Sequence, residues 1–275
     1  MSELTRRLGR SDDARLLILS ADLLGSLHAA NDGVYAALRD GAATTATLAV
    51  PCPWARHAAS TYRGEDVGVH LTLNAPLESL RWGPITQAPS LLDGDGGFPR
   101  TEADLWDHAD IEEVRRECRA QVERAVLWGL RLTHLTTHLN TLQQRPEFFD
   151  VYTDLGVDFG LPLRLEGTEA AERAGFPFRS LAADEGIVVP DHFRYIRPDE
   201  PVDLIALIGE LEYGVTELHL EPAVDTPELR AADPRWPVRV EAHRQLCDPA
   251  TTRAIDEAGI ELIGYAPLAE VQTAG

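Results

Sequence analysis

The 275-residue sequence contains no lysine, so all 25 of its basic residues are arginines. A chain without lysine cannot form a lysine Schiff base, and it lacks the phosphate-binding lysine of a P-loop. The three cysteines, Cys52, Cys118 and Cys247, are too far apart in the sequence to form a metal-binding or redox pair. They fit a reducing compartment, and the charged segment 1–15 contains no apolar signal region. We therefore expect a cytoplasmic protein without disulfides.

The sequence also lacks a long hydrophobic run. No apolar stretch approaches the roughly 20 residues needed to cross a bilayer, which excludes a membrane-spanning helix. The 45 acidic and 25 basic residues give a net charge of -20. Such a surface repels phosphate backbones, so nucleic acid is excluded as a partner and a small-molecule substrate is expected. A homodimer stays open, because the sequence does not distinguish an interface from ordinary core.

Apolar segments typical of strands alternate with segments of helical periodicity along most of the chain. Strands are predicted at residues 16–19, 44–50, 67–73, 130–135, 161–165, 215–220 and 260–263, and helices near 26–41, 111–128, 148–157, 202–211 and 251–258. This alternation favours parallel strands joined by helices, and strands apolar on both faces indicate a sheet that is covered on both sides. No Gly-x-Gly-x-x-Gly motif follows the first strand, so an α/β barrel fits better than a dinucleotide-binding fold.

Two stretches are predicted to be long and irregular. Residues 74–100 carry Trp82, four prolines and a glycine-rich run, and residues 222–238 carry four more prolines and Trp236. Loops of this length in a compact domain are usually lids or binding loops, or else disordered. With no internal repeat or low-complexity tract, we predict one domain over residues 1–275.

Polar side chains occur at the ends of several predicted strands. Asp22 closes the first strand, His70 lies in a later one, His138 follows the strand at 130–135, and His219 and Glu221 end the strand at 215–220. In parallel barrels these strand ends share one mouth, where the chemistry is carried out. Aspartate with two histidines is a common hydrolytic metal set, because it leaves positions open for water and substrate.

Each of these residues also has a purely structural interpretation. Asp22 could cap the following helix, His70 could be a buried hydrogen-bonding residue, and Glu221 could be a solvated loop carboxylate or a general acid or base. His134 and His138 cannot both reach one ion from an extended strand, where four residues span about 13 Å. We therefore assign His138 to the site and His134 to packing. Trp82 could stack on a sugar or anchor its loop, and Cys52 is a packed residue.

Several segments carry a resemblance to a known family. Residues 20–25 (Ser-Ala-Asp-Leu-Leu-Gly), 68–73 (Gly-Val-His-Leu-Thr-Leu) and 133–138 (Thr-His-Leu-Thr-Thr-His) resemble motifs of the YdjC-like carbohydrate deacetylases. The likeness continues through residues 81–84, 89–93 and 222–229 and covers nearly the whole chain. It implies a distorted (β/α) barrel of mainly parallel strands that uses a divalent metal, zinc or magnesium, to remove acetyl groups from N-acetylated sugars.

The resemblance also assigns roles by position. Asp22 matches the family's proposed general base, while His70 and His138 match two metal-ligand histidines. Leu23 stands where the family has a ligand aspartate, Thr136 replaces a motif aspartate, and Glu221 stands where relatives have histidine. Leucine cannot coordinate a cation, and two neutral imidazoles bind magnesium poorly. A site of Asp22, His70, His138 and possibly Glu221 could still hold zinc, with Asp22 as ligand and Glu221 as base. Trp82 and His219 are the expected substrate-binding residues.

Three hypotheses follow from these residues. The first is a metal-dependent hydrolase that removes acetyl from an N-acetylated sugar or a similar amide. The second keeps the fold but performs metal-free acid–base chemistry on a small metabolite, with the same aspartate, histidines and glutamate as proton donors and acceptors. The third is a relative that binds a sugar or acts in regulation without turning its ligand over. The first is preferred.

Overall fold

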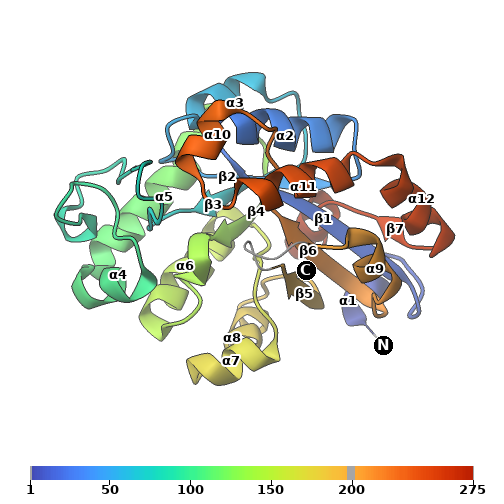
Figure 1. Ribbon diagram of the computed structural model, residues 1–275. Helices are drawn as coiled ribbons and strands as arrows, with labels where there is room; N and C mark the ends of the chain where they lie inside the picture. Colours follow the sequence, from blue (N-terminus) through green and yellow to red (C-terminus); the bar gives the residue numbers. More distant parts are fainter. Residues whose placement is uncertain (1, 197–201, 275) are drawn as a thin grey trace.

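A computed structural model describes residues 2–196 and 202–274 of the chain (Figure 1). Within them, seven strands form one sheet: β1 (Arg15–Leu24), β2 (Thr45–Leu48), β3 (Val67–Leu71), β4 (Leu132–Thr137), β5 (His192–Tyr195), β6 (Gly214–Leu220) and β7 (Glu261–Leu262). The order is β4-β3-β2-β1-β6-β5, with β7 beside the start of β1, and the paired strands are parallel. The sheet curls into a half-barrel, which confirms the predicted α/β class and barrel-like architecture.

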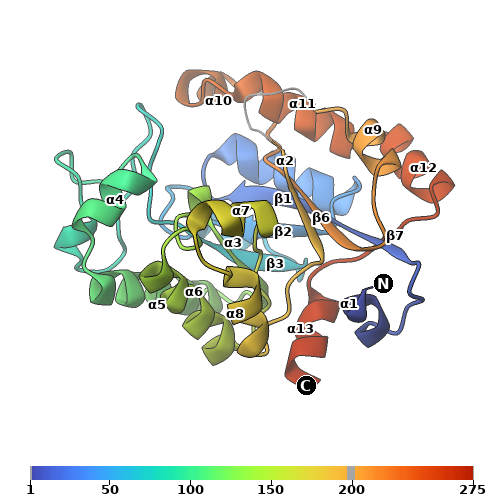
Figure 2. The same ribbon diagram turned by 90° about the horizontal axis from the view of Figure 1, so that it is seen from below.

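Helices connect the strands and cover both sides of the sheet. They are α1 (Glu3–Arg7), α2 (His28–Arg39), α3 (Ala55–Thr61), α4 (Glu102–His108), α5 (Ile111–Leu127), α6 (Pro146–Phe159), α7 (Thr168–Ala174), α8 (Phe178–Asp184), α9 (Leu204–Gly209), α10 (Pro227–Ala232), α11 (Trp236–Leu246), α12 (Pro249–Glu257) and α13 (Ala266–Ala274), with short 3-10 turns η1 (Pro89–Leu91) and η2 (His138–Asn140). Figure 2 shows α9 to α12 along one side of the sheet and α5, α6, α8 and α13 along the other.

Local sequence explains where these elements begin and end. Asp110 caps α5 by accepting hydrogen bonds from the first-turn amides, and the acidic residues there suit the positive end of the helix. α6 begins with Pro146 and ends at Gly160, which adopts the left-handed conformation with φ 64°. β1 is buried along nearly its whole length, as expected for a central parallel strand with helices on both faces.

The structure corrects several sequence-based expectations. Residues 161–165 run extended beside β4 but form one isolated bridge, Leu135 to Leu163, and no full strand. Residues 222–238 are not irregular, because they contain α10 and the start of α11. Proline is tolerated in the first turn of a helix, and Pro227 and Pro237 occupy such positions. Strand β5 and helices α7 and α8 were not anticipated.

The segment 74–100 is the predicted long loop, and α5 holds it in place. The buried Glu117 carboxylate accepts hydrogen bonds from the amides of Ile85 and Thr86 and from the Thr86 hydroxyl. Gln121, one turn later, bonds both the amide and the carbonyl of Thr72, where the chain leaves β3. The loop is therefore anchored to the helix that covers the sheet beside it. None of the helices in the described part of the chain has the length and apolar character needed to span a membrane.

Gly33, in the middle of α2, gives a stability prediction. A Cβ added there would lie 2.7 Å from the Cα of Ala223, so helix and backbone approach too closely for any side chain. Gly33→Ala should therefore destabilise the protein by roughly 1–3 kcal/mol, although alanine normally favours a helix interior over glycine. Urea unfolding measures this. Gly209→Ala at the end of α9 is the control, because no atom lies within 4 Å of its added Cβ; equal stability of the two variants would contradict the packing argument.

Candidate active site

The polar residues predicted at strand ends converge at one edge of the half-barrel. Asp22 is near the end of β1, His70 is in β3, His138 directly follows β4, and His219 and Glu221 lie at the end of β6. A cavity of about 240 Å³ opens there, lined by His70, Glu102, Thr137, His138, Leu139, Asn140, Gln144, Arg164, Phe193, His219, Glu221 and Arg235. The mouth of the strands is therefore the candidate site, as expected for parallel α/β folds.

Asp22 lies beneath this cavity and is fully buried. Its carboxylate accepts hydrogen bonds from the Ser20 hydroxyl at 2.6 Å and from Arg164 Nη1 at 2.5 Å, and His219 Nε2 lies 3.4 Å from Oδ2. The N-cap of α2 is Leu27, so the helix-cap interpretation of Asp22 is wrong. Burial acts to raise the pKa of Asp22, but the charges of Arg164 and then His219 outweigh it and hold that pKa well below its usual range.

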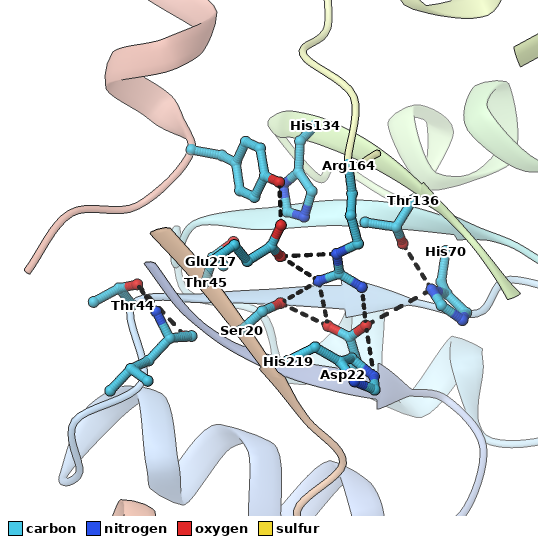
Figure 3. A network of polar contacts seen from close by, with 12 residues as sticks. Ser20, Asp22, Thr44, Thr45, His70, His134, Thr136, Arg164, Glu217 and His219 are labelled. Atoms are coloured by element: carbon cyan, nitrogen blue, oxygen red, sulfur yellow. Dashed lines mark hydrogen bonds and ion pairs between the residues drawn. The ribbon is translucent and has the colours of Figure 1, made fainter. Parts of the chain in front are cut away.

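Arg164 is the centre of a buried charge network that sequence reasoning missed (Figure 3). Its Nε donates to Glu217 Oε1 at 2.8 Å while its other nitrogens bond Asp22 and Ser20. Tyr265 donates its hydroxyl to the second oxygen of Glu217 at 2.5 Å. Burial, and then the Glu217 charge, raise the pKa of Tyr265 well above its usual value, so it remains a donor.

His134 completes the network on the side away from the cavity. Its ring stacks on Tyr265 with centroids 3.8 Å apart and an interplanar angle of 8°. The side chain is fully buried, and its strand position keeps it apart from His138. This confirms the prediction that His134 packs in the strand, and His134 is not among the residues that line the cavity.

His70 and His138 form a close imidazole pair in the cavity wall. His70 Nε2 lies 3.1 Å from His138 Nδ1, and the other ring nitrogen of His70 lies 2.7 Å from the Thr136 hydroxyl. Burial lowers the pKa of His70 well below its usual value and that of His138 to about 4. Both rings are therefore neutral at pH 7 and can act as hydrogen-bond donors, acceptors or ligands.

Glu221, unlike Asp22, lines the cavity itself. Its Oε2 pairs with Arg235 Nη1 at 3.1 Å, and its Oε1 lies 3.8 Å from His219 Nε2. Burial acts to raise the pKa of Glu221, but Arg235 and then Arg239 outweigh it, so the pKa is lowered. Glu221 is thus ionised at neutral pH, and it is not the solvated loop residue that was one of its two interpretations.

Trp82 is 8% exposed and anchors the loop 74–100. Its indole nitrogen donates to the Asn74 carbonyl at 2.8 Å, and its ring meets His138 edge to face at a centroid distance of 6.4 Å. This burial favours the loop-anchor interpretation, and sugar stacking on Trp82 stays a prediction. Cys52 is buried, which raises the pKa of its thiol well above the usual value and agrees with a packed, unreactive residue.

Comparison with known proteins places most of the chain in one family. Residues 16–257 match the family model described as YdjC-like protein. The chain belongs to the YdjC-like family. A carbohydrate deacetylase of Thermus thermophilus is 34% identical over 93% of this chain and 94% of its own length, and one of Geobacillus stearothermophilus is 30% identical over 91% and 97%. A crystal structure from Enterococcus faecalis V583, named provisionally as a cellobiose-phosphate cleavage protein, has a TM-score of 0.82 at 26% identity, over 93% of this chain and 99% of that one.

The metal ligands implied for YdjC-like proteins do not assemble here as a set of three. His70 and His138 converge, but the Asp22 carboxylate is held by Arg164 and lies 3.9 Å from the other nitrogen of His70, the one that faces Thr136. Leu23 supplies no donor atom. Within residues 2–196 and 202–274, no group of three histidine, cysteine, aspartate or glutamate side chains could hold a metal ion. A catalytic zinc usually has three protein ligands, so the residues present do not fit the metal centre that the resemblance implies.

Removal of the Arg164 charge should lower the free energy of unfolding by an amount that depends on pH. Arg164→Met leaves the Asp22 and Glu217 carboxylates buried without their cation, and loss of one partner of a buried pair costs roughly 3–5 kcal/mol. In the native protein the lowered pKa of Asp22 contributes stability at neutral pH that is lost as pH falls below about 5. The variant's unpaired carboxylates have raised pKa values, so its deficit should be greatest at neutral pH and shrink on acidification.

Denaturant unfolding of both proteins from about pH 7 to pH 4 tests this. Arg115→Met removes a solvent-exposed pair with Asp154 and is the matched control, expected to cost less than about 1 kcal/mol. A deficit for Arg164→Met that does not change with pH would argue against the proposed charge pairing.

Proposed function

We propose that this protein is a hydrolase of the carbohydrate deacetylase type, which removes an acetyl group from an N-acetylated sugar. Support comes from its membership of the YdjC-like family and from relatives named carbohydrate deacetylase that align over nearly the full chain. The observation that carries the proposal is a cavity at the strand ends with two carboxylates, three histidines and two arginines in its wall. Its volume of about 240 Å³ suits one sugar ring or the end of a chain.

Glu221 is the general base in this proposal. It lines the cavity, whereas Asp22 is fully buried beneath it, so Glu221 is the carboxylate placed to touch water and substrate. The resemblance would give this role to Asp22. Asp22 is also the weaker proton acceptor, because the adjacent guanidinium stabilises its charged form. We therefore assign proton removal from water to Glu221.

Asp22 and Arg164 act as positioning residues. His219 Nε2 lies 3.4 Å from Asp22 Oδ2 and 3.8 Å from Glu221 Oε1, so it is between the two carboxylates. A carboxylate beside an imidazole fixes the orientation of the ring. His219 is thereby placed to exchange a proton with Glu221 and with a bound substrate, which extends its predicted role in substrate binding.

The reaction consumes one water molecule, and its atoms and protons balance without any other reactant. Water loses a proton to Glu221 while its oxygen bonds to the acetyl carbon, and the carbon–nitrogen bond of the amide then breaks. The leaving nitrogen receives the proton by way of His219, so acetate and a sugar amine are formed. No step is assigned to a metal, because the described donors do not complete a three-ligand site.

Glu221→Gln tests the assignment of the base. The amide keeps the shape of the side chain but cannot accept the proton, so kcat for acetate release from N-acetylated sugars should fall by roughly 10²–10⁴ with a smaller change in KM. Coupled detection of acetate gives both constants, and a melting curve confirms that the variant is folded. Glu123→Gln, an exposed residue of α5, is the control for a loss of one negative charge. Wild-type kcat in Glu221→Gln would exclude Glu221 as base.

Substitution of Leu23 tests whether the absence of a carboxylate at this position limits metal binding. The wild-type protein should retain well below one equivalent of zinc or magnesium after dialysis, as measured by ICP-MS. Leu23→Asp adds the missing carboxylate and should raise zinc affinity in calorimetric titration by on the order of tenfold or more. Leu23→Asn is the matched control, because Leu23 has a positive φ of 71°, which asparagine also tolerates, and asparagine adds no charge.

One tightly held equivalent in the wild type, unaffected by Leu23→Asp, would show instead that other groups complete the site. Turnover that survives chelation would agree with metal-free chemistry. Failure of all N-acetylated sugars would favour acid–base chemistry on another small metabolite. A cytoplasmic location and a homodimer remain predictions.

A further inference from the structure

The cavity contains arginines, but each of them is already paired with carboxylates. Arg164, at the cavity floor, lies between Asp22 and Glu217, each at 2.5 Å. Both carboxylates are fully buried, so the guanidinium cannot leave them for a ligand without exposing two uncompensated charges. Arg164 therefore does not provide a free anion-binding group.

Arg235, at the cavity wall, is paired in the same way. It contacts Glu221 at 3.1 Å and Asp233 at 3.0 Å, and Asp233 also binds the buried Arg239 at 3.0 Å. These contacts join the start of α11 to the end of β6. A ligand anion at Arg235 would compete with two resident carboxylates.

Glu102 adds a further negative charge at the cavity rim. It is the first residue of α4 and lines the cavity, and in the described part of the chain it has no ion-pair partner. Among the described residues, Glu102 and Glu221 line the cavity together with Arg164 and Arg235. The ion pairs behind this lining add the carboxylates of Asp22, Glu217 and Asp233 but the guanidinium of Arg239 alone, so carboxylates outnumber guanidinium groups in the described charge network around the cavity. The chain as a whole carries a net charge of -20, which adds a repulsive field for anions.

We propose that this cavity selects uncharged N-acetylated sugars over their phosphorylated counterparts. The inference rests on the proposed function and names its substrate class. A phosphate group carries about two negative charges and is normally bound by free arginine or by clustered backbone amides. Sugar hydroxyls instead donate to carboxylates and accept from guanidinium groups that remain paired. The amine product, which is cationic, also suits a negatively charged cavity.

This charge balance predicts a substrate different from the one in the name of a structural relative. The Enterococcus faecalis protein is provisionally named for the cleavage of a sugar phosphate. Here a phosphorylated sugar would have to displace resident ion pairs, while its neutral form would not. Selectivity is thus expected to come from repulsion of the wrong substrate as well as from contacts with the right one.

The experiment compares N,N′-diacetylchitobiose with its 6-phosphate, using the full-length protein at about pH 8, where unperturbed imidazoles are neutral. Calorimetry gives Kd, and acetate release gives kcat/KM for each sugar. The neutral sugar should be preferred by on the order of tenfold or more at low ionic strength, with the preference narrowing as salt screens the charges. Glu102→Gln should reduce the preference for the neutral sugar by about two- to fivefold. Glu123→Gln makes the same charge change away from the cavity and should leave the ratio unchanged.

Equal or tighter binding of the phosphorylated sugar overturns the inference, even if that sugar is deacetylated, in which case the proposed function still stands. Absence of binding by either sugar also overturns it. Binding with the expected preference but without acetate release supports the inference on substrate class and counts against the proposed function.

Discussion

Arg164 carries its charge inside the half-barrel, between Asp22 of β1 and Glu217 of β6. It comes from the extended segment 161–165, which lies beside the edge strand β4 and pairs with it by a single bridge. The guanidinium therefore ties this segment to the two central strands, β1 and β6, through side chains where backbone pairing is nearly absent. Three charges in a poorly solvated interior are stable only together, so this contact fixes the positions of the groups around the cavity.

The same contact divides the two carboxylates of the site between different tasks. Asp22 is fully buried and stabilised in its charged form, which makes it a good partner for His219 and a poor proton acceptor. Glu221 follows β6 into the cavity wall, where its pair with Arg235 leaves it in reach of a ligand. Two carboxylates on neighbouring strands thus differ in role because of depth and partners, and residue type alone does not separate them.

The sequence predicts the strand-end residues well because their location follows from topology. Asp22, His70, His138, His219 and Glu221 each end or follow an apolar run, and parallel strands bring such ends to one edge. The sequence does not indicate the ion-pair partners of these residues. Arg164 lies in an apolar run, and an arginine in such a position indicates a buried ion pair, but nothing local names Asp22 and Glu217 as its partners. These contacts depend on how the sheet curls, which no short-range pattern encodes.

The helices show the same difference between features that local sequence determines and features that it leaves ambiguous. The ends of α5, predicted at residues 111–128, agree with the structure to within one residue, because capping and amphipathic spacing are local. The prolines of the segment 222–238 predict a loop, but two of them occupy first turns of helices. Proline there removes no helical hydrogen bond, so its presence in a sequence marks a helix start as readily as a loop.

Leu23 shows how the site chemistry can change while the fold is kept. Between Ala21 and Leu24, β1 has one more residue than β2, and within this bulge Leu23 adopts a positive φ of 71°. This conformation costs a leucine roughly 1–2 kcal/mol, while a short polar residue tolerates it. Two residues later Gly25 has φ 93°, and an added Cβ would lie 2.9 Å from the Cα of Ala55. The turn is thus imposed by the bulge and by Gly25, so the side chain at position 23 can vary without altering the backbone that holds Asp22.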